Sequence, residues 1–202
     1  MMRGLYLVTP DRDDTESLLA ATRSALQGGA ALVQYRHKHA PPALRREQAS
    51  ALLQLCRSHG RPLVINDHVA LCMDIDADGV HVGATDASLE AVRAALGPDK
   101  IVGASCYGDF GLAQAAAGAG ASYVAFGGFY PSRVKEYAVT TAPSIVALAR
   151  ERLTVPVVVI GGMTVENARP LVALGADMAA AISSVYLAAD VEAAAREFAA
   201  LF

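Results

Sequence analysis

Short runs of apolar and β-branched residues recur along the whole chain, with enough residues between them for a helix. Each run is four or five residues long and lacks strict alternation of polar and apolar positions, which is typical of strands covered on both faces. The predicted strands are Leu5–Thr9, Leu32–Arg36, Leu63–Asn66, Gly79–Val82, Ile101–Ser105, Tyr123–Phe126, Val157–Ile160 and Met178–Ile182.

Between these strands, apolar residues recur at intervals of three and four, the period of an amphipathic helix. The pattern is clearest in two stretches, which carry Leu18, Leu19, Thr22 and Leu26 and then Ala51, Leu52, Leu55 and Cys56. Residues that commonly cap helices precede four of the helical stretches, at Asp13, Ser88, Thr164 and Asp190. Strand and helix therefore alternate from one end of the chain to the other.

Eight strand–helix units within 202 residues predict a single-domain (β/α)8 TIM barrel that spans residues 1–202. A doubly wound open sheet is the alternative, but it would use fewer strands and would seldom carry reactive residues at the end of nearly every strand. No linker rich in Gly or Ser divides the chain into domains.

The composition supplies a large core and limits the classes of partner. Hydrophobic residues make up 53% of the chain, charged residues make up 18%, and the formal net charge is −3. This charge gives no general attraction to nucleic acid or to an anionic membrane surface, so we expect neither as a partner. An anionic substrate would need a local cluster of cations.

The three cysteines, Cys56, Cys72 and Cys106, are odd in number and lack CxxC spacing. They predict reduced, buried thiols rather than disulfides or a zinc site. The first apolar run is too short for a signal peptide, and no segment approaches the ~20 apolar residues of a membrane-spanning helix. We therefore expect a cytoplasmic protein.

The second predicted strand ends in the polar run Gln34–Lys38. Side chains of an extended chain alternate between its two faces, so Gln34, Arg36 and Lys38 share one face. In a barrel of this kind the active site lies at the carboxyl ends of the strands. Two cations and an amide there predict a clamp for phosphate or pyrophosphate, with a solvated basic loop as the alternative.

Acidic residues follow the next two strands, where Asn66-Asp67 ends the third strand and Asp86 follows the fourth. Neighbouring strands are about 4.8 Å apart, so these two carboxylates could share one cation. A few hard oxygen ligands, completed by water and a substrate phosphate, are what Mg²⁺ prefers. The alternative is that Asp67 and Asp86 cap the helices that follow. The cationic clamp on the adjacent strand favours the metal.

The last two strands end in Gly161-Gly162-Met163-Thr164 and in Ile182-Ser183-Ser184. The loops after the seventh and eighth strands are the recurrent phosphate site of this architecture. Glycine permits close approach of the backbone, and free N–H groups at a helix start bind anions. These residues therefore predict a second phosphate site, although a tight turn that needs glycine is the alternative.

The loop after the sixth strand is the longest, and it runs from Gly127 through Ser132-Arg133-Val134-Lys135 to Tyr137. Glycine, hydroxyl and cation in a long loop are typical of a lid over an active site, with a surface excursion as the alternative. Lys135 would close on one anion and Ser132 on another. Two anion sites at one barrel mouth predict either the joining of two phosphorylated molecules or one substrate with two phosphates.

Taken in order, these motifs resemble the thiamine phosphate synthase family over nearly the whole chain, from Tyr6-Leu7-Val8-Thr9 to Ile182-Ser183. The most specific matches are the runs 34–38, 64–67 and 78–83, followed by Asp86. The runs 160–164 and 175–177 occur in many phosphate-binding barrels and discriminate less. The resemblance implies a transferase that couples an aminopyrimidine methyl diphosphate to a thiazole ethyl phosphate, giving thiamine phosphate and pyrophosphate.

The resemblance also implies the mechanism and the partners. In such enzymes pyrophosphate leaves first, and the thiazole nitrogen traps the pyrimidine cation. A site with cations and a metal, and without an obvious nucleophile, suits that order. The expected partners are the two small phosphorylated substrates and, as assembly, a homodimer.

Roles carried over from the family motifs cover most of the strand ends. Gln34, Arg36, Lys38, Asn66 and Lys135 would hold the pyrimidine diphosphate, and Ser105 would contact the pyrimidine. Ser132, Val134, Gly162, Ile182 and Ser183 would hold the thiazole phosphate, while Tyr35, His37 and Arg133 belong to the same substrate-binding runs. Asp67 and Asp86 would bind Mg²⁺. Lys135, Arg36 and Ser105 are the expected catalytic residues.

Several positions depart from the family pattern. Val134 stands where a second Thr is usual, Ala84 where Gln is common, and His37 where the clamp has an acid. Two other functions are open: a thiazole tautomerase-like isomerase, and a non-catalytic barrel that binds a phosphate ligand. The isomerase branch has a His where this chain has Tyr107, and a silent barrel would have lost the metal acids or Lys135. The residues therefore favour the transferase.

Overall fold

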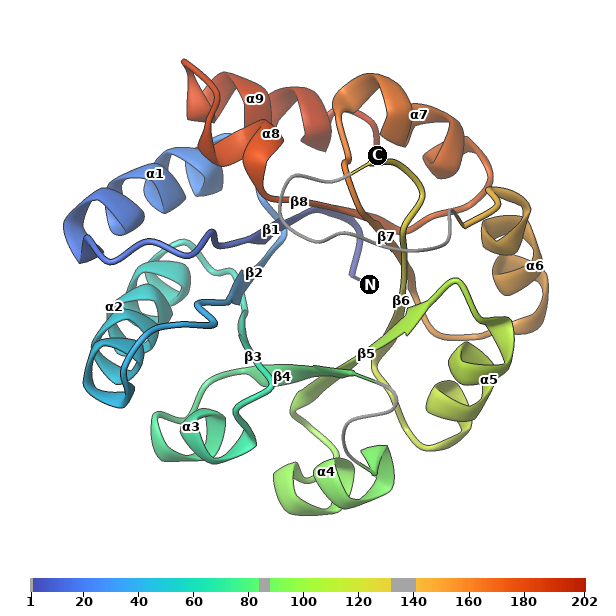
Figure 1. The fold of residues 1–202 in the computed structure, drawn as a ribbon, viewed down its shortest axis with the longest axis horizontal. Coiled ribbons are helices and arrows are strands. Elements are labelled where there is room, and N and C mark those ends of the chain that lie inside the picture. Colours follow the sequence, from blue (N-terminus) through green and yellow to red (C-terminus); the bar gives the residue numbers. More distant parts are fainter. Residues whose placement is uncertain (1, 84–87, 132–140) are drawn as a thin grey trace.

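Each strand pairs in parallel with the next one along the chain, and the last strand pairs with the first, so that the sheet closes into a barrel. The computed structural model describes residues 2–83, 88–131 and 141–202. In Figure 1 the strands form the central ring and the helices lie around it. The (β/α)8 barrel predicted from the sequence is confirmed.

All the predicted strands form, and their ends differ from the prediction by one or two residues at most. The strands are β1 Gly4–Val8, β2 Leu32–Tyr35, β3 Leu63–Asn66, β4 Gly79–Gly83, β5 Ile101–Tyr107, β6 Tyr123–Gly127, β7 Val157–Ile160 and β8 Met178–Ala181. The helices within the described ranges are α1 Thr15–Gln27, α2 Pro42–Ser58, α3 Val69–Asp74, α4 Leu89–Leu96, α5 Phe110–Gly118, α6 Ser144–Arg152, α7 Val165–Ala173, α8 Ser183–Tyr186 and α9 Val191–Ala199.

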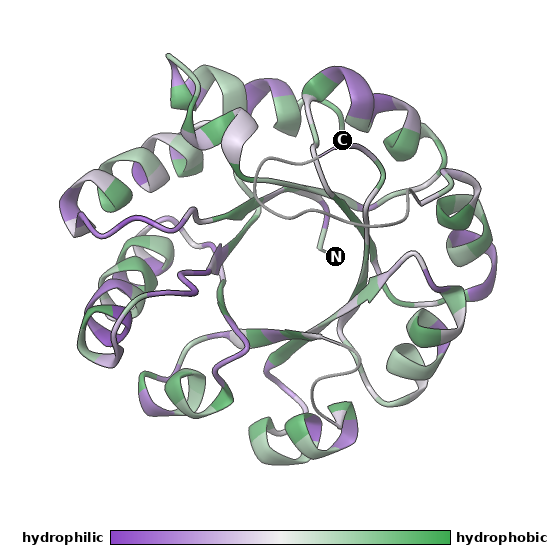
Figure 2. Cartoon of the chain, in the orientation of Figure 1, coloured by the Kyte–Doolittle hydropathy of each residue, from purple (hydrophilic) through white to green (hydrophobic). Residues whose placement is uncertain are grey.

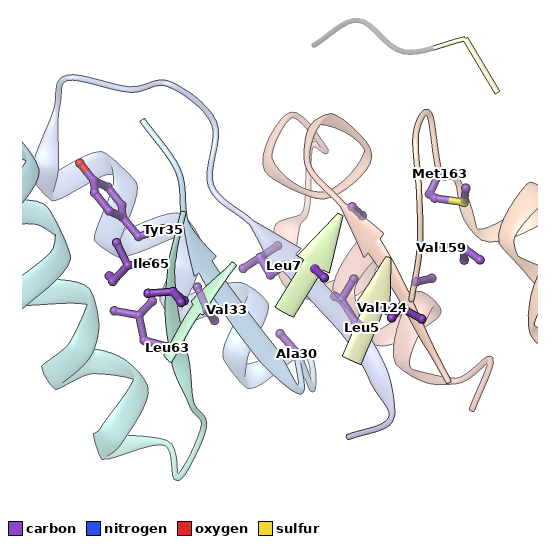
Figure 3. Close-up of a cluster of buried hydrophobic side chains, with 14 of the residues drawn as sticks. Leu5, Leu7, Ala30, Val33, Tyr35, Leu63, Ile65, Val124, Val159 and Met163 are labelled. Atoms are coloured by element: carbon purple, nitrogen blue, oxygen red, sulfur yellow. The ribbon is translucent and has the colours of Figure 1, made fainter. Parts of the chain in front are cut away.

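Alternate residues of each strand face the inside and the outside of the barrel, as the pleat of a strand requires. The inner cluster consists of Tyr6, Val8, Leu32, Val64, Tyr123, Ala125, Val158, Met178 and Ala180. The residues between them belong to a larger cluster that packs against the helices. Figure 3 shows Leu63, Ile65 and Tyr35 of that outer layer pointing to the same side of the strands. Hydrophilic residues collect on the helices and loops, while the strands are mostly hydrophobic (Figure 2).

The helix starts agree with the sequence prediction at three of four positions. Ser88, Thr164 and Asp190 are the N-caps of α4, α7 and α9, and each accepts a hydrogen bond from a backbone N–H of the first turn. The prediction for α1 was wrong by one residue, because Asp14 rather than Asp13 caps it. Asp13 instead lies 3.4 Å from Nε2 of His37.

The predicted thiols are buried, and all three are free. Burial raises the pKa of Cys56 and of Cys106 to about 12 and that of Cys72 to about 11, so they stay protonated at neutral pH. They act as small apolar side chains of the core. Among the helices that the structure describes, none has both the length and the apolar character needed to cross a bilayer.

A glycine in β5 makes room for the largest side chain inside the barrel. A Cβ added to Gly103 would lie 2.1 Å from Cζ of Tyr123 and 2.2 Å from its hydroxyl oxygen. The Tyr123 ring is fully buried, so it has no free space into which it can move. Gly103 is therefore required by packing rather than by its backbone conformation.

We expect Gly103→Ala to lower the free energy of unfolding by about 1–3 kcal/mol, the usual cost of overpacking a core. Urea unfolding followed by circular dichroism measures the change. Gly118→Ala is the control, since a Cβ at the end of α5 meets no atom within 4 Å. That variant should be neutral or slightly stabilising. Equal stability of the two variants would contradict the packing argument.

Candidate active site

A cavity of about 550 Å³ opens at the carboxyl ends of the strands, and every strand contributes a residue to its wall. It brings together predicted site residues that follow or end five different strands. These are Gln34, Arg36, Lys38, Asn66, Asp67, Ser105, Gly162, Ile182 and Ser183. The position of the cavity is the one that a barrel enzyme uses for its chemistry.

Some predicted site residues cannot be placed. Asp86 and Ala84 lie in the segment 84–87, and Ser132, Arg133, Val134 and Lys135 lie in the segment 132–140, both outside the described residues. The second predicted metal ligand and the predicted lid therefore remain predictions from the sequence.

Tyr35 and His37 do not line the main cavity, unlike the other members of their run. The Tyr35 hydroxyl donates to Oε1 of Gln48 at 2.9 Å, and Nδ1 of His37 lies 3.4 Å from the same oxygen. Gln48 in turn donates to the carbonyl of Arg12 at 2.9 Å. These buried contacts hold the loops after β1 and β2 against α2. The two side chains thus lie on the α2 side of the run 34–38, outside the wall of the main cavity.

Arg36 and Lys38 line the cavity although β2 ends at Tyr35. The backbone stays extended beyond the end of β2 because the Thr9 hydroxyl bonds both the N–H and the carbonyl of Arg36. The Arg36 N–H donates to Oγ1 of Thr9 at 2.8 Å, and that hydroxyl donates to the Arg36 carbonyl at 2.9 Å. Asp11 accepts from the Lys38 N–H at 2.9 Å and lies 3.5 Å from the Arg36 guanidinium. This long ion pair leaves the guanidinium able to bind a second anion.

Asp67 lies in the wall of the cavity. Its backbone has the unusual φ of +61°, which is rare for a residue other than glycine. Its N–H continues the ladder by donating to the His81 carbonyl at 2.9 Å. The Asn66 amide donates to Oδ2 of Asp67 at 2.6 Å. Asp67 is not the N-cap of α3, since His68 occupies that position, so the capping alternative is wrong for Asp67.

The donors at this corner are of the kind that Mg²⁺ prefers. Asp67 is exposed and offers a hard carboxylate oxygen beside the cationic clamp. Mg²⁺ commonly takes one or two carboxylates and completes its shell with water and substrate phosphate, so a closed protein cage is not required. In the part of the chain that the structure describes, no three His, Cys, Asp or Glu side chains lie close enough together to hold a metal ion among them. The residues present therefore fit Mg²⁺ better than a metal that needs several protein ligands.

A chain of hydrogen bonds crosses the floor of the cavity. The Gln34 amide donates to the Tyr6 hydroxyl at 2.5 Å, the hydroxyls of Tyr6 and Tyr123 are 2.6 Å apart, and Nδ1 of His81 lies 3.0 Å from the Tyr123 hydroxyl. The His81 and Tyr123 rings are stacked, with centroids 5.7 Å apart. Four strands, β2, β1, β6 and β4, are joined in this way beneath the ligand space.

Burial keeps the two tyrosine hydroxyls of the floor neutral. Desolvation raises the pKa of Tyr6 and of Tyr123 well above the usual range, so both hydroxyls remain protonated near neutral pH. Tyr6, Gln34 and His81 face the cavity, while Tyr123 lies beneath them. The floor thus offers a ligand polar groups that are held in place by their mutual hydrogen bonds.

The second anion corner is built from backbone and hydroxyl groups. Gly162 has φ at +61°, and a Cβ there would lie 2.2 Å from the Pro131 carbonyl oxygen. The Asn167 side chain donates to the Gly162 carbonyl at 2.8 Å and completes a capping box with Thr164 at the start of α7. Only glycine fits this turn, and the turn brings the backbone close to the cavity.

Sequence reasoning missed several residues of the cavity. Tyr6 and His81 line it, and Tyr123 supports it. Ser184, which belongs to the run predicted as a second phosphate site, lines it as well. The hydroxyl oxygen of Ser184 is buried and has no hydrogen-bond partner among the described residues, so it is free to donate to a ligand. The one available signal was the pleat, since Tyr6, Gln34 and His81 occupy inward positions of strands that are otherwise apolar.

A barrel with cations and a carboxylate at one corner of its mouth and a glycine turn at another defines an enzyme of the phosphate-binding (β/α)8 class. The family model described as thiamine monophosphate synthase matches residues 5–185. The chain belongs to this family, and it is a transferase.

Individual relatives agree with this family. Thiamine-phosphate synthase of Janthinobacterium sp. (strain Marseille) is 64% identical, over 100% of this chain and 97% of that protein. Thiamine-phosphate synthase of Methylobacillus flagellatus is 49% identical, over 100% and 96%. The solved structure of thiamine phosphate pyrophosphorylase from Pyrococcus furiosus is 32% identical with a TM-score of 0.87, covering 99% of this chain and 95% of that one.

We expect Tyr123→Phe to lower the free energy of unfolding by about 1–3 kcal/mol, because the buried Tyr6 hydroxyl and Nδ1 of His81 each lose the hydrogen bond with the Tyr123 hydroxyl. Urea unfolding gives the value. Tyr130→Phe is the control, since the Tyr130 hydroxyl donates to the half-buried carbonyl of Asn167 at 3.1 Å and water can replace it. A loss for Tyr123→Phe no larger than for the control would contradict a role of the hydrogen-bond chain in stability.

Proposed function

We propose that the cavity joins an aminopyrimidine methyl diphosphate to a thiazole ethyl phosphate, with Mg²⁺ bound beside the diphosphate. The observation that carries the proposal is the presence of two chemically different corners in one cavity, separated by β1 and joined by a polar floor. Family membership supplies the reaction class. The lining of the cavity supports the proposal, because it offers polar groups at both corners and along the floor.

Arg36 and Lys38 would bind the diphosphate, assisted by Asn66 and by Lys135 of the undescribed loop. As the bond to the pyrimidine methylene breaks, negative charge accumulates on the departing oxygen. Fixed cations stabilise this developing charge more than they stabilise the ground state, so they lower the barrier. Arg36 is suited to this role because its guanidinium can bind two phosphate oxygens at once.

Asp67 and Asp86 would hold Mg²⁺ at this corner. When bound, the ion neutralises charge on the diphosphate oxygens and makes pyrophosphate a better leaving group. Asp67 stands on the wall that the diphosphate would face, and its exposure leaves room for water and phosphate oxygens in the coordination shell.

The pyrimidine ring would lie over the floor, where Gln34, Tyr6 and His81 orient its polar edge and Ser105 contacts it from β5. The C–O bond to the diphosphate breaks and its electron pair leaves with the oxygen. The lone pair of the thiazole nitrogen then forms the new C–N bond. No proton leaves that nitrogen, so the chain needs no general base at this step.

The thiazole phosphate would bind at the corner formed by Gly162, Ile182 and Ser183, with Ser132 and Val134 from the loop 132–140. Ser184 is a further donor there, because its buried hydroxyl faces the same cavity without a partner in the described structure. In this chain Val134 lacks the hydroxyl that the family pattern has, and Ser184 can supply a hydrogen bond in its place.

We also propose that the enzyme works in the cytoplasm, a proposal supported by three free cysteines in a chain of this size.

The proposed reaction is tested by incubating both substrates with Mg²⁺ and measuring thiamine phosphate and pyrophosphate. The proposal requires the two products in equal amounts. Absence of both products would overturn it.

We expect Asp67→Asn to reduce turnover roughly 100-fold or more, because a bound metal contributes several kcal/mol to the stabilisation of charge. EDTA should abolish the wild-type activity, and added Mg²⁺ should restore it. Asp99→Asn is the control, since Asp99 is an exposed acid just before β5, at the end of the barrel away from the cavity. Full activity in EDTA would rule out the metal.

We expect reciprocal effects of variants at the two anion corners. Arg36→Met should weaken the binding of pyrophosphate about 10- to 100-fold, the loss typical of a charge-assisted hydrogen bond, and should leave thiazole phosphate binding nearly unchanged. Ser184→Ala should weaken thiazole phosphate binding up to about tenfold and spare pyrophosphate. Isothermal titration calorimetry measures both. Equal losses of both ligands in either variant would contradict two separate corners.

A further inference from the structure

A smaller pocket of about 210 Å³ adjoins the main cavity between the loops that follow β2 and β3. Its wall consists of Tyr35, His37, Lys38, Arg45, Asn66, Asp67 and His68. Lys38, Asn66 and Asp67 belong to the wall of the main cavity as well, so the two spaces meet at the diphosphate corner. We call this space the side pocket.

Arg45 is the residue of the side pocket that the proposed mechanism does not use. It comes from α2, and its Nη2 donates to the Ala40 carbonyl at 2.7 Å, which fixes the guanidinium against the loop after β2. Its Nε is buried and has no hydrogen-bond partner in the described part of the chain. A buried N–H of a cation without an acceptor is unfavourable, and a ligand oxygen at this point would remove the cost.

The surroundings of Arg45 favour an anion. Lys38 brings a second positive charge, the Asn66 amide brings donors, and Asp67 is the one carboxylate of the wall. Arg46, the next residue of α2, differs because it pairs with Asp74. The side pocket is also reachable from outside, since Arg45, Asp67 and His68 line a wider groove between α2 and α3.

We propose that the side pocket is a phosphate subsite, in which Arg45 binds the terminal phosphate of the pyrimidine diphosphate and of released pyrophosphate. This inference rests on the proposed function, because the diphosphate corner defines where the terminal phosphate lies. The first phosphate is held between Arg36 and Lys38, and Lys38 lies at the boundary of both spaces. An oxygen of the second phosphate then accepts a hydrogen bond from the Nε–H of Arg45, which has no other acceptor in the described structure.

The test is calorimetry of pyrophosphate with Mg²⁺ on the full-length wild type and on Arg45→Met, which keeps an unbranched apolar stem and removes the charge and the donors of the guanidinium. We expect pyrophosphate binding about tenfold weaker and thiazole phosphate binding unchanged. Arg45→Lys should recover part of the affinity, since it restores the charge without the fork of donors. Arg46→Met is the matched control and should bind pyrophosphate like the wild type.

Unchanged pyrophosphate affinity in Arg45→Met would overturn the subsite, and so would an equal loss in Arg46→Met. A loss of thiazole phosphate binding in Arg45→Met would also count against it, because it would show a general disturbance of the barrel mouth. The coupling assay on the wild type separates this inference from the proposed function. If the wild type couples the two substrates and Arg45→Met binds pyrophosphate as tightly as the wild type, the subsite is overturned and the proposed function stands. If the wild type does not couple them but Arg45→Met binds pyrophosphate more weakly, the proposed function is overturned and the subsite stands.

Discussion

The closure of the parallel sheet, with β8 paired to β1, decides which side chains can take part in the chemistry. In a closed barrel every strand has one inward and one outward set of residues, and the assignment changes only where the register shifts, as it does between Ser105 and Tyr107 of β5. Inward positions below the mouth are filled by Tyr6, Tyr123 and smaller apolar residues. Inward positions at the mouth are therefore the ones left for a ligand, and the polar groups at those positions form the site.

The floor connects stability and function through one cross-barrel contact. The hydroxyls of Tyr6 and Tyr123 meet although the residues are 117 positions apart in the chain, and the absence of a side chain at Gly103 lets the Tyr123 ring lie there. The same contact orients Gln34 and His81, which face the ligand space. A change that loosens the packing of the barrel interior would thus also change the orientation of the polar groups that line the cavity.

The fold and the charged part of the site could be predicted from the sequence because both depend on local pattern. The pleat alone places Gln34, Arg36 and Lys38 on one face, and it equally explains why Tyr35 and His37 face α2 instead. The floor could not be predicted, since its partners come from strands far apart in the chain and their register follows only from closure. The positive φ of Asp67 could not be predicted either, because the Asn66-Asp67 pair does not by itself specify a left-handed backbone conformation.

The two anion corners use different donors, and the chemistry of the proposed reaction explains why. In the proposed reaction the diphosphate gains negative charge as it departs, so cations such as Arg36 and Lys38 would bind it more strongly in the transition state than in the ground state, and this difference would increase the rate. The thiazole phosphate keeps its charge from substrate to product. Full cations there would tighten substrate and product alike and would slow release without lowering the barrier. A glycine turn at Gly162 and the hydroxyls of Ser183 and Ser184 offer weaker, neutral donors, which suit a group that has only to be held in position.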